Sequence, residues 1–492
     1  MKKLLSSYLL LSAVLLSGCY KTIDPEDVPE NLTEEEVAER TSINTFAYNV
    51  MSQYYLWNEE ISGAMNSWSP GDNPVEKVLE IRYKDENGKD IDRWTEVTDD
   101  YSGMVSSSTH VSTTYGMDFK LYYSDASKKA VYMVTTLVYP ASPASKTGIS
   151  RGCCFTKING KEITAKNYVE LVNDEFLSSA SVRLTDINGS EISMTAVEMY
   201  EDPVLVHKVF EVDGTPVGYL FYNGFTLDSI NGLVSAASDF KSAGVKELIL
   251  DLRYNLGGYV LTETALASLL APESEVRAGS IFETNIYNKG IAKVLGDSNT
   301  YFTPSISDEI NGLKIEADLI SSNLNLSKLY AIMTESSASA SESLITGLKP
   351  YTDIKIFGSK SHGKFCTGMM LSAKDWYEGI DKSKNKEIAG YEKYAADWGI
   401  YVMIGRFADK NGKTPCMPDG FEPDFQVEDN PTEAYQLGDE NEAMLKAVLS
   451  YIKTGSVNST RAGGTMLTEL PAVNGNACGR RIMTVEKGKL LH

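Results

Sequence analysis

Basic residues are in short supply in this chain of 492 residues. It has 46 lysines and arginines against 67 aspartates and glutamates, and its formal net charge at pH 7 is −21. Binding to the phosphate backbone of nucleic acid needs clustered lysine and arginine. The composition therefore argues against a nucleic-acid partner, and it suits a soluble surface.

Histidine and cysteine are scarce as well. The four histidines show no HExxH-like spacing and the six cysteines no metal-finger spacing, so we expect no zinc site and no other cofactor. If Cys19 is modified as argued below, five cysteines remain, and an odd number cannot all pair within one chain. Cys366 and Cys416 form one candidate disulfide, which the sequence alone does not establish.

Long apolar runs are absent except at the N-terminus. Lys2 and Lys3 precede the apolar run 4–16, as in a signal peptide, and the run ends in Leu-Ser-Gly-Cys19. This ending resembles a bacterial lipobox, which implies cleavage before Cys19 and a lipid on its thiol. The alternative is an ordinary secretory signal with an incidental cysteine. No later stretch approaches the roughly 18 apolar residues of a spanning helix, so we expect a cell-envelope protein that is anchored by its lipid outside the cytoplasm, on a periplasmic or surface face.

The pattern along the chain predicts a multidomain protein of mixed α/β and β class. Aromatic residues from Phe46 to Trp57 recur at helical spacing, and from about residue 202 strands alternate with helices, which indicates an α/β core. The expected parts are a signal peptide (1–18), an acidic tether (19–40), a small helical domain (41–104), a small β domain (105–200), an α/β domain (201–452) and a Gly- and Thr-rich tail (453–492) without clear periodicity.

The stretch Ser-Ala-Ser-Ala-Ser-Glu at 337–342 lies between a strand-like run, 328–334, and a helix-like run, 343–348. A serine at such a junction meets the free N–H groups and the positive dipole end of the helix, which favour a developing anion. It is a candidate nucleophile if a base can take its proton. The alternative is a helix cap with tight packing.

Two residues are candidates for that base. His362 is close in sequence but has no obvious acid partner. Lys364 lies in a glycine-flanked turn after the strand-like run 354–357 and precedes Phe365 and Cys366. An apolar pocket disfavours the ammonium form, so a buried lysine can lose its proton near neutral pH and accept the proton of a serine. The alternative is an ordinary surface lysine.

These motifs together resemble those of the carboxyl-terminal processing (tail-specific) peptidases. They are Leu-Asp-Leu-Arg-x-Asn-x-Gly-Gly at 250–258, the serine repeat, Gly-Lys364, and Gly-Phe-Glu-Pro-Asp at 420–424. The resemblance implies a Ser/Lys peptidase with a PDZ domain and a ClpP/crotonase-like α/β peptidase domain. It makes Ser339 the nucleophile and Lys364, which follows 25 residues later, the general base. Ser337 and Ser341 would then pack or cap.

The oxyanion hole needs backbone donors at the developing charge. The N–H of Ala340 is one candidate, and an N–H of Gly257 or Gly258 is the other, because glycine allows close approach. Many members of the family carry a glutamine four residues after the lysine, where this chain has Gly368. Either another residue supplies this third member, or the site is a bare dyad.

Residues 140–161 resemble part of a PDZ domain. The resemblance makes Tyr115-Gly116-Met117-Asp118-Phe119 the carboxylate-binding loop, whose successive N–H groups would form a nest while the adjacent strand edge pairs with a peptide. Cys153 stands where an acidic residue is usual. The alternative is a small β domain without a ligand.

The sequence thus predicts a lipid-anchored serine endopeptidase that acts on exported or unfolded polypeptides. The PDZ-like domain would capture accessible C-terminal segments. Two alternatives are a catalytically inactive peptide-binding lipoprotein on the same scaffold and a membrane-tethered structural protein that binds no peptide.

Overall fold

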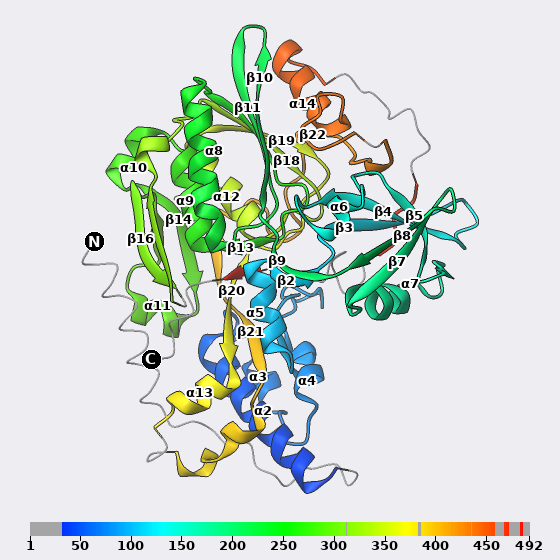
Figure 1. Ribbon diagram of the computed structural model, residues 1–492. Helices are drawn as coiled ribbons and strands as arrows, with labels where there is room; N and C mark the ends of the chain where they lie inside the picture. The colour runs from blue at the N-terminus through cyan, green and yellow to red at the C-terminus, as the bar shows by residue number, and fades with distance from the viewer. Residues whose placement is uncertain are drawn as a thin grey trace.

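The computed structural model describes residues 32–310, 312–381, 385–433, 435–457, 467–471 and 483–485 (Figure 1). The predicted signal peptide and Cys19 lie outside the described residues. Within those ranges, no helix has both the length and the apolar character needed to cross a bilayer. Helix α2 (Glu34–Tyr54) begins inside the segment predicted as a tether, because Thr33 and Glu36 form a capping box at its start.

A six-stranded sheet forms the centre of the α/β part, which confirms the predicted mixed α/β class. Its strands are β10 (Val204–Val212), β11 (Thr215–Tyr222), β12 (Glu247–Asp251), β18 (Lys328–Met333), β19 (Asp353–Gly358) and β22 (Phe425–Gln426), in that order. All neighbours from β11 to β22 are parallel, and β10 pairs antiparallel with β11. Strands such as β12 are continuously apolar because helices cover both of their faces.

The two faces of this sheet carry different helices. On one face Leu248 and Leu250 share a core with α8 (Ile230–Ser242), α9 (Val260–Leu270) and α12 (Ala340–Leu348). On the other face Ile249 and Tyr330 pack against α14 (Ala443–Thr454). Figure 1 shows α8 and α9 on one side of the sheet and α14 on the other.

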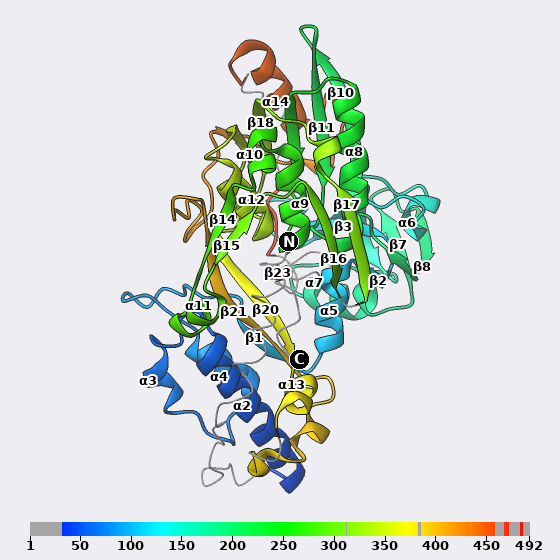
Figure 2. The ribbon, with the colours of Figure 1, turned by 90° about the vertical axis from the view of Figure 1, so that its left-hand side faces the viewer.

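A second sheet lies under the first and carries the long strands β20 and β21, as Figure 2 shows. Its order is β13 (Gly257–Tyr259), β23 (Met483–Val485), β20 (Cys366–Ser372), β21 (Gly399–Ala408), β14 (Ile281–Tyr287) and β15 (Asn299–Tyr301), and β1 (Glu96–Thr98) also pairs with β21. The remaining elements of this part are α10 (Glu273–Ala278), α11 (Lys289–Leu295), α13 (Ala373–Gly379) and the hairpin of β16 (Ser305–Ile310) and β17 (Leu313–Asp318).

The N-terminal helices do not form a domain of their own, contrary to the boundary predicted at 41–104. Helices α2, α3 (Ser62–Met65) and α4 (Pro74–Ile81) bury their apolar residues in the core that also contains β20 and β21. The ring of Phe46, for example, lies 5.5 Å from that of Trp376 on α13. The apolar face of α2 finds its partner far along the chain, which a local pattern cannot indicate.

Residues 111–200 form the predicted small β domain with its own core. Its main sheet has the order β3 (Met117–Tyr123), β4 (Val131–Val138), β5 (Cys154–Ile158), β7 (Ser181–Asp186) and β8 (Glu191–Thr195), with β6 (Lys161–Glu162) beside β5. Strands β2 (Val111–Thr114) and β9 (Val197–Tyr200) pair separately. The domain's helices are α6 (Pro143–Lys146) and α7 (Tyr168–Glu170), which continues as a π-helix over Leu171–Leu177, and α5 (Tyr101–Thr109) precedes the domain.

Candidate active site

Ser339 lies at the junction between β18 and α12, where the sequence predicts the nucleophile. It is the N-cap residue of α12, it is fully buried, and its backbone has φ 59° and ψ −116°. Positive φ is rare for residues other than glycine and stores about 1–3 kcal/mol of strain. The fold therefore holds this serine in a strained turn at the start of a buried helix.

The two flanking serines of the repeat, Ser337 and Ser341, form hydrogen bonds with the loop that follows β12. The hydroxyl of Ser337 donates to the carbonyl of Leu252 at 2.7 Å, and that of Ser341 donates to the carbonyl of Asn255 at 3.0 Å. The N–H of Ala338 donates to the same Asn255 carbonyl at 3.0 Å. These hydrogen bonds agree with the packing or capping role expected for Ser337 and Ser341, and they fix the position of Ser339 between them.

Lys364 lies in the loop between β19 and β20 and is completely buried. Its Nζ is 3.4 Å from Ser339 Oγ, and it donates a hydrogen bond of 2.7 Å to the hydroxyl of Tyr401 on β21. The ring of Trp94 lies 6.0 Å from the same nitrogen. Burial lowers the pKa of Lys364 to about 7, although the nearby Cys366 and Asp92 act in the opposite direction. A large share of this lysine is therefore neutral near pH 7 and able to accept a proton.

Tyr401 is the residue that the sequence did not reveal. It faces Lys364 from β21 across the position of Gly368 on β20, where the register of the two strands shifts. A Cβ atom at Gly368 would lie only 2.4 Å from two ring carbons of Tyr401. The tyrosine ring thus fills the space in which a side chain at 368 would stand. The available signal was Gly368 itself, because a glycine inside a strand often marks a close approach by another group.

Glu342 joins the loop of the nucleophile to the loop of the base. Its carboxylate accepts hydrogen bonds from the N–H groups of Ser339 (3.2 Å), Gly363 (2.7 Å) and Lys364 (2.8 Å) and from the hydroxyl of Ser361 (2.5 Å). Burial raises the pKa of Glu342 to about 7, and these hydrogen bonds act against that rise. The sequence alone gives Glu342 no role, and its contacts in the structure make it a positioning residue.

The Gly-Phe-Glu-Pro-Asp motif at 420–424 forms hydrogen bonds that hold the loop carrying Lys364 in place. Phe421 and Ser361 exchange two hydrogen bonds, one from the Phe421 N–H to Ser361 Oγ at 2.7 Å and one from the Ser361 N–H to the Phe421 carbonyl at 3.1 Å. Gly420 has φ 97°, and a Cβ there would meet the Ser361 carbonyl at 2.1 Å. Asp424 accepts from the N–H of Ile356 on β19 at 2.7 Å. This motif therefore keeps Lys364 at its distance from Ser339.

The hydrogen-bond partner and the surroundings of His362 differ from those of Lys364. Its Nδ1 lies 3.2 Å from the carbonyl of Glu335, and its ring packs near Trp94. Burial, and then the charge of Arg93, lower the pKa of His362 to about 4. The imidazole bonds to a backbone carbonyl rather than to a carboxylate, so the geometry favours Lys364 as the base.

The predicted oxyanion donors differ in availability. The N–H of Gly257 donates to Asn255 Oδ1 at 2.9 Å, so Gly257 is no longer a candidate. Gly258 has φ 146°, and a Cβ there would lie 2.3 Å from the carbonyl oxygen of Phe225, which only glycine avoids. Ala340 is the first residue of α12, where helix N–H groups have no intrahelical partner. Ala340 and Gly258 remain the candidate donors.

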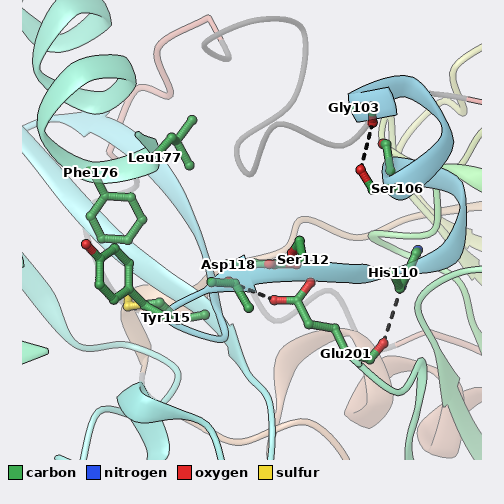
Figure 3. Close-up of a pocket in the computed structure, with 12 residues that line it drawn as sticks. Gly103, Ser106, His110, Ser112, Tyr115, Asp118, Phe176, Leu177 and Glu201 are labelled. Carbon is green, nitrogen blue, oxygen red and sulfur yellow. Dashed lines mark hydrogen bonds between the residues drawn. The ribbon is translucent and has the colours of Figure 1, made fainter. Parts of the chain in front are cut away.

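The predicted carboxylate-binding loop, Tyr115–Phe119, opens onto a pocket of about 170 Å³ between α5 and the β domain (Figure 3). Two observations weigh against a carboxylate nest there. The N–H of Gly116 already donates to Thr114 Oγ1 at 3.0 Å, and Met117, Asp118 and Phe119 are paired with β4. In addition, Asp118 and Glu201 line the pocket, where they would repel a carboxylate.

The cysteines within the described ranges are free thiols. Cys366 and Cys416 are buried and form no disulfide, and Cys153 and Cys154 are partly buried. Burial raises the pKa of both Cys366 and Cys416. The same part of the chain contains no group of three side chains that could hold a metal ion.

A strained serine at the start of a buried helix, beside a desolvated lysine on an α/β scaffold, is the arrangement of a serine-type peptidase. Residues 216–427 match the model of peptidase family S41. Over this stretch the chain is similar to peptidase family S41, in agreement with the resemblance of its motifs to the C-terminal processing proteases.

Individual relatives show the same similarity. A "Probable CtpA-like serine protease" of Staphylococcus aureus is 27% identical over 352 residues, which are 69% of this chain and 65% of that protein. Its counterpart in Staphylococcus haemolyticus is 24% identical over 53% of this chain and 47% of its own length. The chain thus spans less than two thirds of the curated relatives that it matches. A solved "Putative S41 protease" from Bacteroides fragilis covers 87% of this chain and 99% of its own, with 21% identity and a TM-score of 0.62, and shares the fold.

Proposed function

We propose that this protein is a serine endopeptidase with a Ser339–Lys364 dyad. The observation that carries the proposal is the 3.4 Å separation of Lys364 Nζ and Ser339 Oγ inside a pocket that lowers the lysine pKa to about 7. A neutral amine is the form that can act as a base, and its burial keeps a large neutral fraction near physiological pH.

In the acylation step, neutral Lys364 takes the proton of the Ser339 hydroxyl while Oγ attacks the carbonyl carbon of the scissile peptide bond. The N–H groups of Ala340 and Gly258 donate to the oxyanion. Lys364, now an ammonium, gives its proton to the leaving amine as the C–N bond breaks. The Tyr401 hydroxyl accepts a hydrogen bond from Nζ and orients it throughout. Lys364 then deprotonates a water molecule that hydrolyses the acyl-enzyme, and the ammonium returns the proton to Ser339.

The proposed substrates are exported or unfolded polypeptides, which would bind as extended strands. The β domain supports this, because β3 is the edge strand of its main sheet, and an extended polypeptide can add to such an edge. The structure of the loop at 115–119 fits peptide capture along this edge better than it fits capture of a terminal carboxylate. Anchoring by a lipid on Cys19 in the cell envelope remains a prediction from the N-terminal sequence.

The test is cleavage of a fluorescently labelled, reduced and unfolded protein. We expect Ser339→Ala and Lys364→Ala each to remove activity while the protein stays folded. A Ser339→Ala variant that cleaves as fast as the parent would refute the mechanism, and an active Lys364→Ala variant would return His362 to consideration as the base.

A serine-reactive fluorophosphonate separates this proposal from that of an inactive peptide-binding scaffold. Labelling of the parent, and not of Ser339→Ala, requires a nucleophilic oxygen at this position. A parent that neither cleaves nor is labelled would favour the inactive scaffold.

A further inference from the structure

The edge strand β3 of the β domain pairs with the chain's own tail. The N–H of Tyr123 donates to the carbonyl of Thr468 at 2.9 Å, and the N–H of Leu470 donates to the carbonyl of Leu121 at 2.8 Å. Tyr122 and Glu469 form an antiparallel bridge. Residues 467–471 thus extend the sheet beyond β3 by main-chain hydrogen bonds, which is how extended peptides add to a sheet edge.

Side chains reinforce this attachment. Leu470 is only 3% exposed and belongs to the core of the β domain, together with Phe119 and Leu121. Glu469 pairs with Lys120 at 2.9 Å. Main-chain pairing, one buried apolar anchor and one ion pair are the parts of a specific peptide-binding site. The pairing is antiparallel, so the tail runs from Tyr123 toward the loop at 115–119.

A second piece of the tail lies at the proposed catalytic site. Strand β23 stands between β13 and β20 and is parallel to both, with Met483 opposite Gly257, Thr484 opposite Gly258 and Val485 opposite Gly368. Strand β13 carries the proposed oxyanion donor Gly258, and β20 begins two residues after Lys364. In the order of this sheet β13 and β20 are not direct neighbours, so β23 fills a slot one strand wide beside the dyad.

We infer that the C-terminal tail is an internal ligand that occupies both peptide-binding positions of this protein, the edge of β3 and the slot between β13 and β20. The identification of these positions as substrate sites rests on the proposed function. A tethered segment has an effective concentration in the millimolar range. In the resting protein the tail therefore occupies both positions, and a substrate polypeptide gains access by displacing residues 467–471 and 483–485.

The binding test uses the full chain in a Ser339→Ala background, so that it does not depend on proteolysis. The probe is a fluorescein-labelled synthetic peptide with the sequence of residues 467–485, and its binding is followed by fluorescence anisotropy. Leu470→Asp removes the apolar anchor. Thr484→Pro breaks β23, because a strand that is paired on both sides does not accept proline. Thr468→Asp is the matched control, because the Thr468 side chain is exposed while its carbonyl makes the main-chain bond.

We expect the doubly substituted Leu470→Asp/Thr484→Pro chain to bind the probe at least about tenfold more tightly than the Ser339→Ala parent, as expected when a buried leucine no longer holds a competitor in place. The Thr468→Asp control should bind like the parent. Equal binding by the parent and the double variant, with equal thermal unfolding, would overturn the inference.

In the active chain the same double substitution should lower KM for the unfolded protein substrate about tenfold and leave kcat unchanged, because a competing internal ligand changes apparent affinity only. Cleavage with unchanged KM would count against the tail as a competitor and leave the peptidase proposal standing. Absence of cleavage in every variant would refute the peptidase proposal, and the anisotropy measurement would still decide whether the tail competes for peptide.

Discussion

Replacing Tyr401 by phenylalanine tests whether the tyrosine is the third member of the site. The substitution keeps the ring that packs against Gly368 and removes the hydroxyl that accepts from Lys364 Nζ at 2.7 Å. A hydrogen bond to a charged group contributes about 1.5–3 kcal/mol. Lys364 becomes an ammonium only as the serine attacks, so the loss falls on the transition state. At 1.36 kcal/mol per factor of ten, kcat/KM should fall about 10- to 150-fold.

The pH dependence gives a second readout that a merely structural role would not change. The hydroxyl stabilises the ammonium more than the neutral amine, so its removal should lower the pKa of Lys364 below its value of about 7. The same 1.5–3 kcal/mol corresponds to roughly 1 to 2 pH units. The rising limb of kcat/KM, measured from pH 5 to 9 on a labelled unfolded protein, should therefore move to lower pH while the plateau falls.

A double substitution that moves the larger side chain from position 401 on β21 to position 368 on β20 provides the matched control. Gly368→Gln alone should be poorly tolerated, since a Cβ at 368 already meets the ring of Tyr401. Gly368→Gln combined with Tyr401→Ala has the space for the glutamine that the family usually carries, and we expect it to recover part of the activity that Tyr401→Ala loses. A Tyr401→Phe variant with parental kcat/KM and an unshifted pH limb would refute the assignment.

Three further outcomes follow from burial and strain. The unfolding free energy of Ser339→Gly, measured by chemical denaturation, should exceed that of Ser339→Ala by about 1–3 kcal/mol, because glycine accepts φ 59° without strain. Equal unfolding free energies would argue against a strained turn. In the parent, the folded pKa of Lys364 lies below its unfolded value, so the unfolding free energy should rise as the pH increases from about 7 to 10. Lys364→Met should be inactive but no less stable than the parent at pH 7. Its unfolding free energy should lack the part of the increase between about pH 7 and 10 that comes from Lys364. Parallel plots of unfolding free energy against pH for the two proteins would contradict the depressed pKa. Arg253→Met should lower the unfolding free energy by about 3–5 kcal/mol, because the buried Asp251 and Glu442 lose the guanidinium to which they bind at 2.6 and 2.7 Å. A change of less than about 1 kcal/mol in the unfolding free energy from chemical denaturation would show that water reaches the two carboxylates.

The residues of the proposed dyad could be predicted from the sequence because both lie in recognisable local motifs. Ser339 follows a buried strand and opens a helix, and Lys364 sits in a glycine turn after the next strand, so adjacent parallel strands bring the two together. Tyr401 could not be found in this way. It lies on an antiparallel strand of another sheet, and an aromatic residue in an apolar strand is indistinguishable from core.

The same limit explains the tail and the N-terminal helices. Residues 467–471 and 483–485 take their extended form from the strands beside them and carry no periodicity of their own. Helix α2 shows its apolar residues plainly, but nothing in its pattern says that they pack on α13 and β21. Contacts between distant segments, and not local propensity, determine these parts of the fold.

The environment of Lys364 also sets the smallest fragment that could work as a peptidase. Trp94 lies against the lysine, and the nearby buried Asp92 is held by Tyr55 through a hydrogen bond of 2.8 Å. None of these three residues falls within the family-matching stretch 216–427. A fragment cut to that stretch would contain both members of the dyad, yet it would let water reach the amine and return its pKa toward that of a free lysine. The stretch that matches the family model is therefore shorter than the stretch of chain that builds the proposed active site.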